Sequence, residues 1–338
     1  MSVSDTRAQI PSVVERTRPL KADAAVVAAH FLEQIAVFVL GEEALLFLSP
    51  TGEARTIPVH GGAILASAAA DASRIVTGGD DGKVMATDAD GKSITLASDA
   101  KHRWIDHVAA GPAGAVAWSA GKEAFVRTAK GAERTLAVPS TAGGLAFAPK
   151  GLRLAVAHYN GVTLWFVNAQ SEPDVLQWKG SHLAARMSPD GRFLITSMQE
   201  PALHGWRIAD RKDMRMSGYS ARVRSFEFNA GGKWLATSGS NQLVLWPFQG
   251  KEGPMGKTPR MLAPAQAQVE VVACHPKQEA VAVGYADGLV LLVRIEDGAE
   301  VLARKGAGAP ITALAWSASG VALAFGAEDG EAGVIDLG

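Results

Sequence analysis

Short apolar runs recur along the chain, and each leads through a turn into a second apolar run. Successive copies start about forty residues apart, which is the spacing typical of four-stranded propeller blades. The runs are too short for core helices, and apolar residues at helical spacing are nearly absent. Eight runs have the character of innermost blade strands: 26–31, 64–69, 105–110, 144–147, 183–187, 223–228, 269–274 and 311–316.

The clearest repeat shows how one unit is expected to fold. The turn Ser188-Pro189-Asp190-Gly191 leads to a second apolar strand at 193–197, and a third strand carries Trp206. A more polar fourth strand then precedes the next unit. Other repeats place an Asp-Gly or Asn-Gly pair after the second strand, as two-residue hairpins require: Asp81-Gly82, Asn160-Gly161, Asp287-Gly288 and Asp329-Gly330.

The two ends of the chain complement each other. The last repeat stops shortly after Val334 and lacks a fourth strand, whereas the segment 10–20 precedes the first repeat. We therefore expect 10–20 to supply the missing outer strand, where Pro19 is tolerated because an outermost strand can lack a donor. The predicted fold is all-β: one closed propeller domain over residues 1–338, with eight blades favoured and seven allowed. The expected repeats are 25–62, 63–104, 105–141, 142–180, 181–220, 221–266, 267–308 and 309–338.

These repeats resemble the WD40 family, as a diverged, bacterial-type member. The Ser-Pro-Asp-Gly turn, the Asp-Gly turns, the third-strand tryptophans and the spacing carry the resemblance, whereas the Trp-Asp pair itself is missing. The family often buries a His, Ser/Thr, Asp and Trp network in each repeat, but no repeat here has all four residues. The resemblance implies structural roles for His182, Ser197, Trp165, Trp206, Trp246, Asp81, Asp287 and Asp329.

Composition limits the possible functions. Of the 338 residues 48% are hydrophobic, and the net charge is −1, so no basic surplus favours nucleic acid or an anionic membrane. The single cysteine, Cys274, excludes a disulfide within the chain and zinc sites built on several cysteines. Neither a signal peptide nor a membrane span is evident, so we expect a cytoplasmic protein, a monomer or one subunit of a complex.

The resemblance implies a non-catalytic scaffold that binds another protein or peptide, with no cofactor. Large and basic side chains gather at the fifth and sixth repeats, and such types are common in interface cores. They could form a docking patch for an acidic partner, or simply be solvated turn charges. The predicted binding residues are Arg207, Arg211, Lys212, Arg215, Tyr219 and Arg222, with Lys251, Met255 and Arg260 from a long Gly/Pro-rich connection.

The alternative is a metal-handling or enzymatic propeller with a site at the channel mouth. His30, His107 and His275 are expected on innermost strands, but they come from separate repeats without ligand spacing, so packing roles are favoured. Cys274 aligns with core positions and is expected to be buried and inert. Trp104 and Trp178 lie outside the third-strand positions and are either partner anchors or caps between blades.

Overall fold

The computed structural model describes residues 10–306 and 308–338, which form thirty β-strands and two short 3₁₀ helices, η1 (Val14–Arg16) and η2 (Pro112–Gly114). The chain divides into two compact units, which are described separately. Unit 1 comprises the N-terminal part up to Leu40, then Leu46–Arg55 and Gly218–Gly338. Unit 2 comprises Gly41–Leu45 and Thr56–Ser217. The fold is an all-β propeller, as expected.

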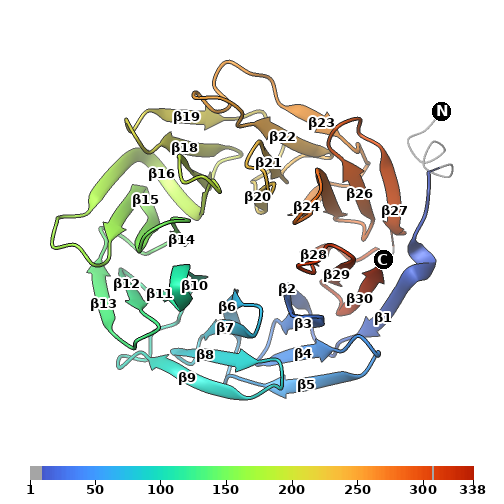
Figure 1. Cartoon of the computed structure of the whole chain (residues 1–338), viewed down its shortest axis with the longest axis horizontal. Coiled ribbons are helices and arrows are strands. Elements are labelled where there is room, and N and C mark those ends of the chain that lie inside the picture. Colours follow the sequence, from blue (N-terminus) through green and yellow to red (C-terminus); the bar gives the residue numbers. More distant parts are fainter. Residues whose placement is uncertain (1–9, 307) are drawn as a thin grey trace. The chain divides into compact units, whose positions relative to one another are not determined.

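Unit 2 contains two four-stranded sheets and one six-stranded sheet, each with neighbouring strands in chain order (Figure 1). Their strands are β6 (Ile64–Asp71), β7 (Arg74–Gly79), β8 (Lys83–Asp88) and β9 (Ser93–Ser98); β10 (His107–Ala110), β11 (Val116–Ala120), β12 (Glu123–Arg127) and β13 (Glu133–Ala137); β14 (Gly144–Phe147), β15 (Arg153–Phe166), β16 (Asp174–Met187), β17 (Phe193–Met198), β18 (Leu203–Arg207) and β19 (Asp213–Met216).

Unit 1 contains three four-stranded sheets, and a further sheet, β2-β3-β4-β5, has residues in both units. The strands are β2 (Val26–Leu32), β3 (Ile35–Leu40), β4 (Ala44–Leu48) and β5 (Ala54–Pro58); β20 (Phe226–Phe228), β21 (Trp234–Thr237), β22 (Leu243–Pro247) and β23 (Arg260–Leu262); β24 (Val269–Cys274), β25 (Ala280–Tyr285), β26 (Val290–Arg294) and β27 (Glu300–Arg304); β28 (Ile311–Trp316), β29 (Ala322–Ala327), β30 (Glu331–Asp336) and β1 (Thr17–Lys21).

The described residues thus form seven sheets, the number that the sequence allowed beside the favoured eight. The difference arises because the fourth and fifth repeats share the six-stranded sheet. β15 reverses at Asn160 and Gly161, which both have positive φ, and the amide of Val167 returns to the carbonyl of Leu152 at 3.0 Å. β16 then pairs with β15 through its first part and with β17 through its second part, so one continuous strand joins the two repeats.

All eight runs predicted as innermost strands contain strand residues. β14, β24 and β28 have the predicted bounds, but β20 begins at Phe226 instead of residue 223. The amides of Arg224 and Ser225 donate to the hydroxyl of Ser238, so they cannot extend the strand ladder. β10 likewise begins late, because the amide of Ile105 bonds to the carbonyl of Gly79 in the preceding repeat.

The N-terminal strand completes the last repeat, as predicted. β1 pairs antiparallel with β30, from Thr17 opposite Ile335 to Lys21 opposite Glu331, in unit 1 (Figure 1). Pro19 stands opposite Gly333, where a Cβ would lie 2.7 Å from the carbonyl oxygen of Arg18. The strand order β1-β30-β29-β28 therefore combines the two ends of the chain in one sheet, which removes an exposed strand edge.

The core of each unit lies between successive sheets. In unit 2, Val76, Ile105 and Trp118 belong to one apolar cluster between β6–β9 and β10–β13. In unit 1, Tyr285 is fully buried in the cluster between β20–β23 and β24–β27, and its hydroxyl donates to the carbonyl of Ala263. Because neighbouring sheets bury each other's faces, no repeat could form its core alone. Within the described residues, no helix has the length and hydropathy to span a membrane.

Candidate functional site

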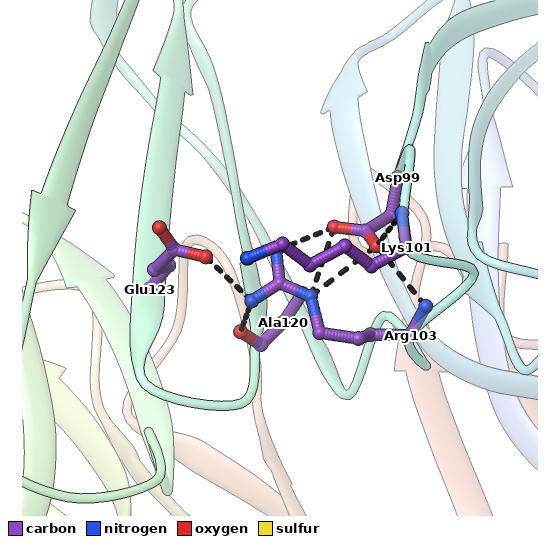
Figure 2. Close-up of polar contacts among 5 residues, drawn as sticks. All are labelled: Asp99, Lys101, Arg103, Ala120 and Glu123. Carbon is purple, nitrogen blue, oxygen red and sulfur yellow. Dashed lines mark hydrogen bonds and ion pairs between the residues drawn. The ribbon is translucent and has the colours of Figure 1, made fainter.

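A cluster of charged side chains holds the connection between the second and third repeats in unit 2. Arg103 donates from Nε and Nη2 to the carboxylate of Asp99, and from Nη1 to Glu123 and to the carbonyl of Ala120 (Figure 2). The amides of Lys101 and Arg103 also donate to Asp99. The hydrogen bonds from the Arg103 side chain lower the pKa of Asp99 to about 2, and the two carboxylates raise the pKa of Arg103.

Trp104 follows this cluster directly and is exposed over 60% of its surface. Its neighbours in the chain are fixed on both sides, because Arg103 binds two carboxylates and Ile105 is fully buried. The indole therefore projects from a segment whose backbone is held in place. A bulky apolar side chain so exposed on a fixed loop is a feature that ordinary packing does not require.

Hydrogen bonds continue from Arg103, the neighbour of Trp104, across the next repeats. Arg103 reaches the turn 120–123, whose Gly121 and Lys122 carbonyls accept from the amides of Ala142 and Val138. In the connection 138–143, the hydroxyl of Ser140 accepts from the amide of Tyr159, which is 57% exposed. We call this surface the Trp104 strip. It comprises Lys101, Trp104, Lys122, Pro139, Thr141 and Tyr159, all of which are exposed in unit 2.

Buried polar networks recur at matching places in three repeats. In the second repeat, His60 binds Asp81 through Nδ1 at 3.0 Å and Thr77 through Nε2 at 2.8 Å. In the fifth, the Nδ1 of His182 lies 2.7 Å from the hydroxyl of Thr196, and the ring packs against Trp206. The partner of His182 is thus Thr196, and Ser197 is buried in the same strand.

The sixth repeat holds the corresponding network with a tyrosine, Tyr219, which the sequence analysis predicted as a docking residue. The indole Nε1 of Trp246 donates to the Tyr219 hydroxyl at 2.6 Å, and this hydroxyl lies 2.9 Å from that of Thr237. Burial raises the pKa of the Tyr219 phenol. The Tyr219 hydroxyl is therefore engaged inside the blade, although the residue is only half-buried, and its place before Thr237 and Trp246 is the sequence signal for this network.

Family and structural comparisons agree with this geometry. The WD40 family described as "WD domain, G-beta repeat" matches residues 212–247, and the "Anaphase-promoting complex subunit 4 WD40 domain" matches residues 274–338. The chain is a WD40-repeat β-propeller. A search of curated proteins found no match.

Solved structures resemble this WD40 propeller over most of its length. The computationally designed Ika8 protein is 18% identical, with a TM-score of 0.74 over 94% of this chain and 97% of its own. A chain of a mitotic checkpoint complex is 13% identical, with a TM-score of 0.63 over 94% of this chain and 93% of its own. At these identities the likeness concerns the fold alone.

The remaining residues to which the WD40 resemblance assigned structural roles lie within the blades or in their turns. Trp165, Trp206 and Trp246 are all buried on third strands. The carboxylates of Asp81, Asp287 and Asp329 each accept from the amide two residues further on, and so hold their turns. Trp178 is half-buried and stacks on His204 at 4.0 Å between ring centroids, which is the cap arrangement.

The predicted basic patch has residues in both units. In unit 2, Arg207 is mostly buried and pairs with Asp210, while Arg211 pairs with Asp174. Lys212 and Arg215 are exposed there. Arg207 therefore already pairs with a carboxylate of its own repeat and Arg211 with one of the preceding repeat, which reduces the charge that a partner would meet.

In unit 1, Arg222 and Lys251 are exposed, as is Met255. Arg260 instead donates to the carbonyls of Ile295 and Glu296, and its guanidinium lies over the ring of Trp234. Arg260 thus fastens the sixth repeat of the propeller to the seventh.

The three histidines expected near the channel occupy separate sites. His30 lies on β2, and burial lowers its pKa to about 4, while burial also lowers the pKa of His107 on β10. His275 follows β24, where its Nδ1 accepts from two backbone amides and its Nε2 donates to the carbonyl of Gly320. Cys274 is buried, and burial together with Glu227 raises the pKa of its thiol.

A pocket of about 380 Å³ in unit 1 opens beside the first residues of β24 and β28. Its polar lining includes Arg224, Glu270, Thr312 and Glu328, and Arg224 lies 3.9 Å from Glu270. Among residues 10–306 and 308–338, no group of three or more His, Cys, Asp or Glu side chains is arranged to hold a metal ion.

Proposed function

We propose that this WD40 propeller is a non-catalytic cytoplasmic scaffold that docks an acidic segment of another protein on the Trp104 strip. The observation that carries the proposal is the exposed indole of Trp104 beside the bound Arg103. Trp and Tyr dominate binding energy in many interfaces because they bury large areas at small entropic cost. Trp104 and Tyr159 provide two such anchors on one hydrogen-bonded surface.

The fixed backbone supports a docking role. Asp99, Arg103 and Glu123 tie the loop of Trp104 to the neighbouring repeat before any partner binds. A partner therefore meets a pre-organised surface, and less conformational entropy is lost on association.

The charges of the strip favour an acidic occupant. The carboxylates of Asp99 and Glu123 are bound by Arg103, whereas Lys101 and Lys122 are exposed and have no ion pair among the described residues. Exposed lysines beside aromatic anchors would attract acidic side chains, increase the association rate and make it sensitive to salt.

The basic patch of the fifth and sixth repeats is the competing docking site. The Trp104 strip is favoured because its lysines lack ion-pair partners within the described chain, whereas Arg207 and Arg211 are paired and Arg260 binds backbone carbonyls. Tyr219, the aromatic anchor of that patch, is also committed to a buried network.

Site-specific photo-crosslinking would test the proposal. A photoreactive phenylalanine is introduced at Trp104, at Tyr159 and, as a matched exposed control, at Ile94. We expect the first two positions to cross-link the same partner and the third to cross-link none. The double variant Lys101→Glu/Lys122→Glu should lower partner recovery, and Trp104→Ala should weaken binding about thirtyfold, as for an anchor worth roughly 2 kcal/mol.

The double variant Arg211→Glu/Arg215→Glu provides the opposing arm. If it abolishes partner recovery while Trp104→Ala and the lysine reversal leave recovery unchanged, docking belongs to the basic patch and the Trp104 strip is the wrong surface. Circular dichroism of every variant verifies that the propeller remains folded.

A further inference from the structure

The N-terminal segment crosses between two repeats before it becomes β1. The carbonyl of Pro11 accepts from the amide of Leu302 on β27 at 2.8 Å, and the amide of Val13 donates back to the carbonyl of Leu302 at 2.9 Å. Ser12 thereby forms a parallel bridge with the outer strand of the seventh repeat. After η1, the same chain pairs with β30 of the eighth repeat.

A pocket of about 630 Å³ lies at this crossing, wholly within unit 1. We call it the crossover pocket. Its lining comes from the crossing segment, the turn after β24, the start of β25, strands β26 and β27, the turn after β28, and Leu337 after β30. The volume falls within the range of small-molecule sites. Since Pro11, Val13 and Arg16 are part of the lining, the pocket is complete only when the N-terminal segment is in place.

The inner wall of the crossover pocket is largely apolar. Trp316, Val301 and Leu337 line it. The ring of His275 packs edge-on against Trp316, and both of its nitrogens are engaged with backbone groups, as is the indole nitrogen of Trp316. The polar atoms of this wall are therefore satisfied, and the rings offer apolar surface to an occupant.

The charged lining is predominantly basic. It contains Arg16, Lys277 and Arg294, against one carboxylate, Glu300. Arg294 forms a two-point pair with Asp297. Arg16 and Lys277, in contrast, have no ion-pair partner among residues 10–306 and 308–338. An occupant with an apolar body and one negative group would satisfy both parts of the site.

We propose that the crossover pocket binds a small amphipathic organic carboxylate. Its hydrocarbon or aromatic body packs against Trp316, Val301 and Leu337, and its carboxylate lies between Arg16 and Lys277. Because Arg16 belongs to the crossing segment, the ligand also fastens that segment to the seventh repeat. Binding to the folded form alone stabilises it.

Sodium octanoate is the probe, and 1-octanol is its uncharged control of equal chain length. Titration calorimetry on the full chain should show octanoate binding at least tenfold more tightly than octanol, because a charge-assisted hydrogen bond contributes more than a neutral one. Hydrogen exchange at residues 11–16 should slow when octanoate binds. Arg16→Gln/Lys277→Gln should weaken octanoate about tenfold or more and leave octanol unchanged, whereas Lys130→Gln/Lys150→Gln in unit 2 should alter neither.

Val301→Trp gives a second, independent arm, since the larger side chain fills the pocket and should abolish binding of both probes. The proposal is overturned if octanoate does not bind, if octanol binds equally well, or if the glutamine pair at Arg16 and Lys277 binds octanoate like the wild type. Protection that appears in segments other than 11–16 and the pocket walls would also overturn it. None of these outcomes depends on the protein partner, so this site and the Trp104 strip are tested separately.

Discussion

The second and sixth repeats build a polar network at the same place with different chemistry. In the sixth repeat, the indole of Trp246 donates to Tyr219, whose hydroxyl meets Thr237, and Thr237 donates to the carbonyl of Val244. In the second, Thr77 contacts the Nε2 of His60, and Nδ1 of the same ring contacts the carboxylate of Asp81.

The residue opposite the second strand explains the difference. In the sixth repeat, Trp246 on the third strand pairs with Leu235 on the second. In the second repeat, the residue that pairs with the equivalent Ile75 is Thr87. With a tryptophan, the chain of donors starts at the indole and can end on a backbone carbonyl, so no charge is needed. Without it, the imidazole carries the proton on Nδ1 and needs an acceptor, which the carboxylate of Asp81 provides. The repeats therefore preserve the positions of the network while changing its residues and its direction.

Removal of the indole should have the largest effect on this comparison. Trp246→Ala deletes a buried side chain and the first donor of the network, and large core truncations cost about 3–5 kcal/mol. Urea unfolding monitored by circular dichroism measures the loss. Trp104→Ala is the matched control and should change stability by less than about 0.5 kcal/mol, because its side chain is exposed. Equal losses in the two variants would show that Trp246 is not a core residue.

Tyr219→Phe should have an intermediate effect. It keeps the ring but removes the hydroxyl that accepts from Trp246 and meets Thr237, so two buried polar groups lose a partner. An unsatisfied buried group costs about 1–3 kcal/mol. Urea unfolding again gives the value, and Trp246→Phe with Tyr219→Phe completes a double-mutant cycle. Additive losses in that cycle would mean that the two residues do not interact.

The repeat pattern was enough to predict most of the fold. The apolar runs ahead of turns located all eight innermost strands, and the missing strand after Val334 predicted the pairing of β1 with β30. The joining of the fourth and fifth repeats could not be predicted, because β16 continues through Gln177–Ser181 although this stretch contains Gly180, a typical turn residue with positive φ. The predicted strand lengths were wrong where a side chain, such as that of Ser238, accepts hydrogen bonds from backbone amides that a longer strand would use.

The candidate site was less accessible to sequence reasoning. Arginines of the basic patch looked free because their partners, Asp174 for Arg211 and backbone carbonyls for Arg260, come from other segments. For Trp104 the sequence left two roles open, a partner anchor or a cap between blades. The exposure of its side chain depends on how Arg103 holds the loop, which the sequence does not show. The network role of Tyr219 was not predicted, because a tyrosine before the innermost strand is also typical of an interface. In each case the contacts that matter join segments far apart in the sequence, which sequence patterns alone do not reveal.

The carboxylate in the second repeat makes a smaller, pH-dependent prediction. Burial alone would raise the pKa of Asp81, but hydrogen bonds from His60 and from the amides of Gly61 and Lys83 outweigh it, so its pKa lies below the ordinary 3.8. A carboxyl group with a lowered pKa in the folded state stabilises it above the unfolded pKa and loses this contribution as the pH falls through the folded pKa. Asp81→Asn should therefore cost about 1 kcal/mol near pH 6, the usual net value of a hydrogen bond, and less near pH 3.

Tyr219→Phe provides the matched comparison for this titration. The network of the sixth repeat contains no group that titrates between pH 3 and 6, so its loss should be the same at both values. Urea unfolding of the wild type and of the two variants at pH 6 and pH 3 gives the stability cost of each substitution at each pH. The titration of the other carboxylates affects wild type and variant alike, so it cancels in each cost. A cost for Asp81→Asn that stays constant from pH 6 to pH 3 would mean that the charge of Asp81 does not stabilise its network. The networks of the two repeats would then differ in geometry alone, and the lack of a tryptophan in the second repeat would not account for the presence of Asp81 in its network.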